Sequence, residues 1–216
     1  MKTLVCLHAA ISGPGTWDGV RPGLTALGYQ LHCPTLLGHE NAVRRESYPL
    51  TAFRDQVVHE LDAAGVERFT LVGHSLGAFV ASLIAQQHPD RVDRLVLEEL
   101  PVPPRDAQDH PPARRGTGPV MRLLAGFSRR SYDPVMFRQV LAQLVEPQPR
   151  WWSDLSAITA PTLLLAGGPG SHLDQTRYQL LASSLPSATI TTVDSGHRIH
   201  SKSPDRWLAA VAGFLR

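Results

Sequence analysis

The stretch FTLVGHSLGAFVAS at residues 69–82 restricts the possible folds of this chain more than any other. An apolar run leads into the pentapeptide GHSLG at residues 73–77 and continues directly into an Ala-rich helical pattern. We read these elements as a buried strand, a tight turn with Ser75 at its tip, and a helix. The two glycines suit this turn because the helix start crowds against the strand end, where a Cβ has little room. Ser75 is therefore predicted to stand exposed at the carboxyl end of a sheet, above a helix N-terminus whose free N–H groups favour a developing oxyanion.

The rest of the chain alternates between apolar runs of strand length and helical patterns. Besides the strand that begins at residue 69, strands are predicted at residues 3–7, 29–33, 92–98, 162–166 and 189–193. Helices are predicted after Ser75 to about residue 87 and at residues 17–27, 50–64, 135–145, 175–185 and 204–215. This alternation is typical of an open, mostly parallel α/β sheet that helices cover on both faces. The Pro-rich residues 101–157 interrupt it, so we expect a cap or lid insert there, with the core formed by residues 1–100 and 158–216.

Composition excludes several classes of function. A net charge of +2 over 216 residues, with scattered arginines, argues against nucleic-acid binding. No stretch approaches the roughly 18 apolar residues that span a bilayer, and the N-terminal MKTLVCLHAAISG resembles a buried strand more than a signal peptide. The two cysteines, Cys6 and Cys33, are expected to be reduced thiols, which favours the cytoplasm. Neither a metal-ligand spacing such as His-Glu-x-x-His nor a glycine-rich phosphate loop occurs, so we expect no metal and no other cofactor, and a small molecule as the substrate.

A serine hydroxyl needs a base before it can act as a nucleophile, and the usual base is a histidine held by a carboxylate. The chain has ten histidines. His197 follows the last predicted strand in the sequence DSGH, which places it on a loop at the carboxyl end of the sheet, within reach of Ser75. His74, next to Ser75, is expected to have a packing role because the turn directs it elsewhere. His197 is therefore the predicted base.

The motifs around these residues resemble those of the α/β-hydrolase superfamily over nearly the whole chain. The resemblance rests on LHAAISGPGTW, PTLLGHE, LVGHSLG, LVLEELPVPP, PTLLLAGG and DSGHRIH. It implies a cofactor-free serine hydrolase whose triad follows the chain order nucleophile, acid, histidine. It also implies a six-stranded sheet, because the two leading strands usual in the family have no counterpart here. The backbone N–H groups of Leu76 and Ala10 are the implied oxyanion donors. Ala9 or Ile11 remain alternatives to Ala10, since this chain has His-Ala where relatives often have His-Gly.

The acid is the position at which this chain departs from the family. In most relatives the acid follows the strand before the last, in a turn that here reads GGPGSH (residues 167–172) and is followed by Asp174. The haloalkane dehalogenase branch places the acid after the preceding strand, and matching VDRLVL to that branch puts Glu99 in its position. Strand alternation also sends one of two adjacent glutamates into the sheet unless it has a partner. Glu99 is therefore the predicted acid, with Asp174 as the alternative and Glu98 and Asp194 as further candidates.

The predicted reaction is hydrolysis of a carboxylic ester of a small molecule through an acyl-enzyme. The same site would suit a carbon–carbon bond or lactone hydrolase, or a non-hydrolytic biosynthetic enzyme. A ligand-binding protein of this fold could also keep the pocket without turnover. His172 and His200 flank the two predicted catalytic loops and are candidates for lining the pocket, with hydrogen bonding within loops as the alternative.

Overall fold

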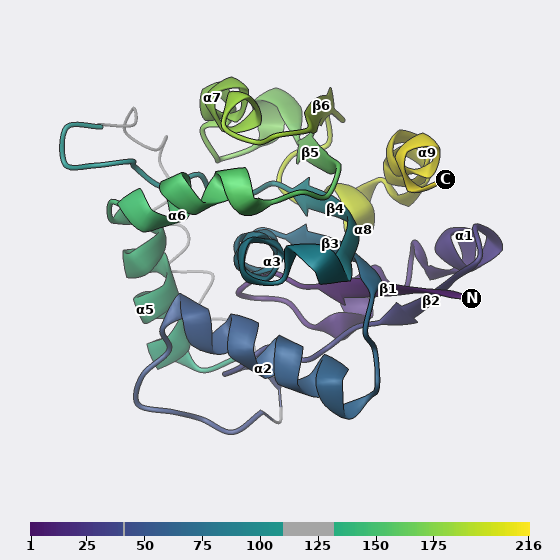
Figure 1. Cartoon of the computed structure of the whole chain (residues 1–216), viewed down its shortest axis with the longest axis horizontal. Coiled ribbons are helices and arrows are strands. Elements are labelled where there is room, and N and C mark those ends of the chain that lie inside the picture. Colours follow the sequence, from purple (N-terminus) through teal and green to yellow (C-terminus); the bar gives the residue numbers. More distant parts are fainter. Residues whose placement is uncertain (41, 110–131) are drawn as a thin grey trace.

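A six-stranded parallel sheet forms the centre of the molecule (Figure 1). The computed structural model describes residues 1–40, 42–109 and 132–216. In space the strands follow the order β2-β1-β3-β4-β5-β6, and each neighbouring pair is parallel. Their bounds are Lys2–Leu7 (β1), Tyr29–His32 (β2), Phe69–His74 (β3), Val92–Glu98 (β4), Thr162–Ala166 (β5) and Ala188–Thr192 (β6). The predicted parallel α/β sheet of six strands is confirmed.

Two hydrophobic cores lie on the two faces of the sheet, because strand side chains alternate between the faces. In β1, Val5 and Leu7 belong to one core, whereas Leu4 and Cys6 belong to the other. The first core packs against helices α2 (Leu50–Ala63), α3 (Leu76–Gln87) and α7 (Tyr178–Ser183). The second packs against α1 (Arg21–Ala26), α8 (Ile199–Lys202) and α9 (Pro204–Leu215), and Figure 1 shows α1 and α9 together at the right. Helices on both faces are thus confirmed.

The helix predicted at residues 17–27 is interrupted. The chain forms a 3-10 turn, η1 (Pro14–Trp17), and then the six-residue helix α1. Pro22 explains the interruption, since proline has no N–H to donate and fits a helix only in its first turn. It occupies the second position of α1, so the helix cannot extend back through it.

The other helices follow the predicted pattern with two additions. The segment 175–185 divides into a 3-10 turn, η5 (Gln175–Arg177), and α7. In the described part of the chain, two short helices were not expected as separate elements, namely α6 (Pro149–Ser153) and α8. Within the described ranges, no helix combines the length and the apolar character needed to cross a membrane.

The described part of the predicted insert is built around α5 (Pro134–Val145), which lies beside α6 at the left of Figure 1. The side chain of Gln139 accepts a hydrogen bond from the backbone N–H of Tyr48 at 2.8 Å and donates to the carbonyl oxygen of Glu46 at 2.9 Å. These bonds fix α5 against the segment that precedes α2. Residues 110–131 of the predicted insert lie outside the described residues, and its role as a lid stays a prediction.

Candidate active site

Ser75 occupies a strained turn between β3 and α3. Its backbone has φ 55° and ψ −115°, and a positive φ is uncommon for a residue with a side chain. A Cβ on Gly73 would lie 2.3 Å from the carbonyl oxygen of Gly77, and a Cβ on Gly77 would lie 2.2 Å from that of Leu7. Both positions therefore require glycine, because a Cβ would clash with the backbone, as predicted from the sequence. Strain of this kind is typical of functional sites, where the surrounding structure holds it in place.

Backbone hydrogen bonds hold the turn on both sides. The N–H of Ser75 donates to the carbonyl oxygen of Glu98 at 3.0 Å, at the end of the neighbouring strand β4. The carbonyl oxygen of Ser75 accepts from the N–H groups of Ala78 and Phe79 at 3.0 and 3.1 Å. Leu76 is the first residue of α3, so its N–H has no partner within the helix. The predicted oxyanion donor is thus the next residue after Ser75, at a helix N-terminus.

Glu99 follows β4 in a second positive-φ position, at φ 50°, and its side chain is fully buried. Its Oε2 lies 3.1 Å from Nδ1 of His197. The carboxylate also accepts hydrogen bonds from the N–H of Gly167 at 2.6 Å, from Nε2 of Gln175 at 2.6 Å and from the hydroxyl of Ser171. The structure therefore brings the predicted acid and the predicted base into direct contact.

The other candidate acids are engaged elsewhere. Asp174 caps the turn η5, where its Oδ1 accepts hydrogen bonds from the N–H and hydroxyl of Thr176. Asp194 is exposed at the start of the loop that carries His197. Glu98 is buried on the opposite side of the strand end, against His200. Among these candidates, Glu99 is the one with a hydrogen bond to His197 in the described part of the chain.

His197 sits among other histidines at the carboxyl end of the sheet. The ring of His172 lies 4.2 Å from its ring, centroid to centroid, and the ring of His74 lies 4.9 Å from it. Nε2 of His74 donates to the main-chain oxygen of His197 at 2.6 Å. The side chain of His197 is 21% exposed, so it borders solvent. The hydrogen bond from His74 holds its backbone. The position of His172 beside this ring is compatible with pocket lining.

The loop that carries Ala10 is fixed by two buried histidines. His39 donates from Nε2 to the carbonyl oxygen of Ala10 at 2.8 Å. His8 bonds through Nδ1 to the carbonyl oxygen of Ala9 at 2.9 Å, and its Nε2 accepts from the N–H of Leu36 at 3.1 Å. These contacts anchor the carbonyl side of the loop, and the N–H of Ala10 remains the proposed second oxyanion donor.

Two buried histidines, His8 and His74, are together expected to lower the free energy of unfolding by about 4 kcal/mol between pH 7 and pH 5. Burial lowers the pKa of His8 and of His74 from 6.5 to about 3 in each case. Both rings are therefore neutral in the folded protein, whereas the unfolded chain binds two more protons below pH 6.5. Stability is full above pH 6.5 and is lost as the pH falls from there toward 3. Denaturant titrations at both pH values measure the change.

The matched variants for this titration are His8→Gln and His59→Gln. His8→Gln removes one buried histidine and is expected to reduce the loss by about 2 kcal/mol. His59→Gln removes an exposed histidine on α2 and should leave the loss unchanged. A loss of stability that is the same in all three proteins would contradict the assignment to buried histidines.

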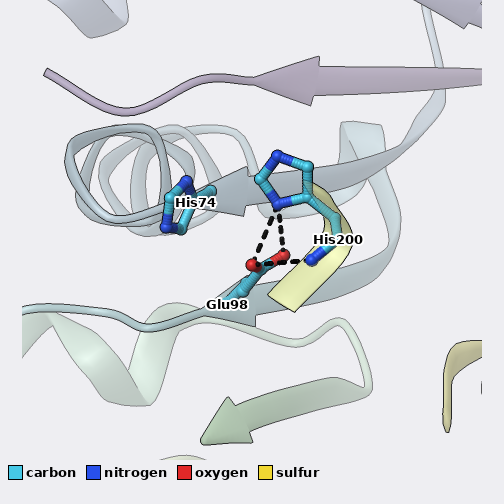
Figure 2. A group of neighbouring side chains, drawn as sticks. All are labelled: His74, Glu98 and His200. Carbon is cyan, nitrogen blue, oxygen red and sulfur yellow. Dashed lines mark hydrogen bonds and ion pairs between the residues drawn. The ribbon is translucent and has the colours of Figure 1, made fainter. Parts of the chain in front are cut away.

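Glu98 and His200 form a second buried acid–histidine pair, next to the candidate site (Figure 2). Nδ1 of His200 lies 2.9 Å from both carboxylate oxygens of Glu98, and neither residue is exposed. The other ring nitrogen of His200 lies 2.8 Å from the hydroxyl oxygen of Thr16. His200 is therefore enclosed and hydrogen-bonded on both ring nitrogens, which favours the predicted alternative of loop hydrogen bonding over pocket lining. The sequence alone does not show tertiary contacts, so it cannot distinguish an exposed loop histidine from one at the buried start of a short helix.

His74, Glu98 and His200 offer atoms that could bind a metal ion, all within 4.8 Å of one another among the described residues. However, Oε1 of Glu98 also accepts from the N–H groups of Ile199 and His200, at 2.8 and 3.2 Å. Its Oε2 accepts from Nε1 of Trp207 at 2.9 Å. Hydrogen bonds therefore satisfy this carboxylate without a cation.

Comparison with known proteins assigns the family. The family model described as "alpha/beta hydrolase fold" matches residues 2–121, more than half of the chain. The chain belongs to the α/β hydrolase family. The resemblance predicted from the sequence motifs is thereby confirmed.

Individual relatives of this α/β hydrolase match it at low sequence identity or over only part of its length. An uncharacterised protein of Mycobacterium tuberculosis is 37% identical over 95 residues, which cover 44% of this chain and 28% of that protein. Esterase YbfF of Escherichia coli is 25% identical over 196 residues, which cover 78% of this chain and 75% of that protein. A carboxylesterase structure from Nitrososphaera gargenis has a TM-score of 0.82 at 16% identity, over 99% of this chain and 89% of that chain. The chain spans less than a third of the mycobacterial relative, and the structural likeness shows the fold.

Sequence reasoning missed the groups that surround Glu99 in this α/β hydrolase. The N–H of Gly167, the hydroxyl of Ser171 and the amide of Gln175 all donate to its carboxylate. Gly167 and Ser171 lie in the turn at residues 167–172, which the motif resemblance implied as the usual position of the acid. A carboxylate that enters this turn from the neighbouring strand needs hydrogen-bond donors there. A serine and a glutamine shortly after β5 are the sequence signal for such donors.

Proposed function

We propose that this α/β hydrolase is a serine hydrolase that cleaves a carboxylic ester of a small molecule. Ser75 is the nucleophile, His197 the general base and Glu99 the acid. The contact between Nδ1 of His197 and Oε2 of Glu99, at 3.1 Å, carries the proposal, because both residues follow strands at the edge where Ser75 occupies its strained turn. The relation to an E. coli protein named as an esterase supports ester hydrolysis.

In the first half of the reaction, His197 takes the proton of the Ser75 hydroxyl as Oγ attacks the ester carbonyl. The carbonyl oxygen becomes an oxyanion, which the N–H groups of Leu76 and Ala10 stabilise. His197 then gives its proton to the leaving alcohol, and the acyl group remains on Ser75. In the second half, His197 takes a proton from water, and the hydroxide attacks the acyl-enzyme. As the carboxylic acid leaves, His197 returns this proton to Oγ of Ser75.

Glu99 holds the imidazole in the orientation that this sequence requires. Its bond to Nδ1 of His197 leaves Nε2 to exchange protons with Ser75. Gly167, Ser171 and Gln175 occupy the remaining acceptor positions of the carboxylate, so Glu99 cannot rotate freely away from the ring. Its complete burial removes competing water and strengthens the attraction to the imidazolium that forms during the reaction.

A fluorophosphonate probe tests the nucleophile directly. The wild-type protein is expected to gain one phosphonyl group, detected by intact-mass spectrometry, and Ser75→Ala is expected to gain none. Ser156→Ala, which removes an exposed serine on the turn Asp154–Ala157, should be labelled like wild type. Labelling of Ser75→Ala at the wild-type rate, or a folded wild-type protein that is not labelled, would contradict the proposed enzyme.

A panel of p-nitrophenyl esters and lactones then tests the bond cleaved. Turnover of the esters, lost in Ser75→Ala, is the expected result. A protein that is labelled but cleaves only lactones, or no member of the panel, would overturn the assignment to ester hydrolysis while leaving Ser75 as the nucleophile.

A further inference from the structure

We propose that Glu98 is a positioning residue that holds the loop carrying His197 in register with Ser75. The inference rests on the proposed function of this site. It concerns the pair of Glu98 and His200 in Figure 2, which takes no part in the proposed reaction steps.

The side chain of Glu98 binds the start of α8, two residues after His197. Its Oε1 accepts from the N–H of Ile199 at 2.8 Å and from that of His200 at 3.2 Å. The same carboxylate binds the ring of His200 through Nδ1, and Figure 2 shows these bonds converging on Glu98. Because Ile199 is only two residues from His197, these bonds restrict where the backbone of His197 can lie.

The backbone of Glu98 connects the same residue to the nucleophile turn. Its carbonyl oxygen accepts the N–H of Ser75 at 3.0 Å. Glu98 therefore contacts the Ser75 turn through its main chain and the His197 loop through its side chain. The next residue, Glu99, binds the His197 ring, so two adjacent glutamates hold the backbone and the ring of one histidine.

A second contact extends the arrangement to the other loop of the site. His200 connects Glu98 to Thr16, with 2.8 Å between its Nε2 and the hydroxyl oxygen of Thr16. Thr16 lies in η1, which follows the loop of Ala10. The ring of Trp17 stacks on the ring of His200 with 4.0 Å between centroids and fixes its plane. The loop that carries the proposed oxyanion donor is thus attached to the same carboxylate.

The charge of Glu98 is retained in spite of its position. Burial alone would raise the pKa of this carboxyl group, but His200, His74 and the hydrogen bonds from His200 lower it to about 2. An ionised carboxylate accepts hydrogen bonds at both oxygens and donates none, which is what the surrounding N–H groups require. A neutral amide cannot replace it without placing a donor against a donor.

Glu98→Gln is the test of this role. The added NH₂ group must face at least one of the donors from Ile199, His200 or Trp207, so the loop of His197 is displaced. A displacement of about 1 Å costs on the order of 10²-fold in rate. We therefore expect kcat for p-nitrophenyl acetate to fall by roughly 30- to 100-fold, with KM changed by less than about threefold because Glu98 is enclosed beneath the site.

Tyr29→Phe is the matched control. It removes a buried hydrogen bond of 2.8 Å, from the Tyr29 hydroxyl to the carbonyl oxygen of Leu215, at the amino end of β2. It should lower the denaturation midpoint while leaving kcat within about twofold of wild type. Equal falls of kcat in Tyr29→Phe and Glu98→Gln would reduce Glu98 to a stabilising residue and overturn the proposal.

Proton NMR provides a readout that does not depend on activity. The Nδ1 proton of His197, assigned by its loss in Glu99→Gln, is expected to shift or broaden in Glu98→Gln and to stay unchanged in Tyr29→Phe. An unchanged signal in folded Glu98→Gln would refute the positioning role. This result stands even if fluorophosphonate fails to label the wild-type protein, an outcome that would contradict the proposed function alone.

Two further measurements complete the test. If Glu98→Gln does not fold, Glu98→Asp retains the charge but shortens the side chain, and it is expected to change kcat and the NMR signal in the same directions. Stoichiometric zinc in the purified protein, absent from the Glu98 variant and required for activity, would replace the positioning role with a metal site.

Discussion

Glu99→Gln is expected to lower kcat by about four orders of magnitude while the protein remains folded. The substitution replaces a carboxylate oxygen by an NH₂ group close to Nδ1 of His197. A neutral amide neither stabilises the imidazolium nor selects the tautomer in which Nε2 can accept the proton of Ser75. The initial rate of p-nitrophenyl acetate hydrolysis measures the effect, and circular dichroism confirms that the variant is folded.

Asp174→Asn is the matched control for this prediction, because it makes the same acid-to-amide change in the alternative acid. Asp174 caps η5 through its Oδ1, and an asparagine retains this oxygen acceptor. Its kcat should stay within about twofold of wild type. The proposed triad is incorrect if Asp174→Asn loses activity by orders of magnitude and Glu99→Gln does not.

Gly77→Ala is expected to destabilise the fold by more than about 4 kcal/mol, a large share of the roughly 5–15 kcal/mol that stabilises a typical domain. The new Cβ would lie 2.2 Å from the carbonyl oxygen of Leu7 and 2.7 Å from that of His8. Backbone atoms cannot move aside as the end of a flexible side chain can, so α3 would have to separate from β1. Denaturant titration of the purified variant, or its loss to the insoluble fraction, measures the effect.

Gly213→Ala provides the opposite expectation within the same protein. Gly213 lies in α9, and a Cβ there meets no atom within 4 Å. Alanine favours a helix by about 0.5–1 kcal/mol over glycine, so this variant should be slightly more stable than wild type. Similar effects of the two substitutions would show that crowding at Gly77 is not what requires glycine.

Much of the fold was predictable from the sequence because its strands are short apolar runs bounded by glycine and proline. The strand ending at His74, the glycines around Ser75 and the long helices all follow from local patterns with a physical cause. The interruption at Pro22 was also visible, but the apolar positions between Trp17 and Leu27 suggested one continuous helix. The restriction that Pro22 places on the helix outweighed the apolar pattern.

The candidate site was less predictable because its contacts join loops that are far apart in the sequence. Strand alternation indicated that one of two adjacent glutamates needs a buried partner, and Glu98 has this partner in His200. The identity of that partner was not readable, since nothing local distinguishes His200 from the other histidines. Ser171 and Gln175, which follow β5 and donate to Glu99, can be identified only once the Glu99 carboxylate is taken to enter that turn. The roles of Ser75, His197 and Glu99 stay predictions.

The position of Glu99 has a consequence for how this scaffold can change its substrate range. His74 and Glu98 are register partners on neighbouring strands, so Ser75 and Glu99 each lie one residue beyond the same rung of the sheet. Strands stay about 4.8 Å apart whatever the loops do, so the separation of these two residues is set by the backbone ladder. The loop between β5 and η5 contains neither of them. A library that varies this loop around His172, while retaining Gly167 and Ser171, is therefore expected to leave the spacing of nucleophile and acid undisturbed.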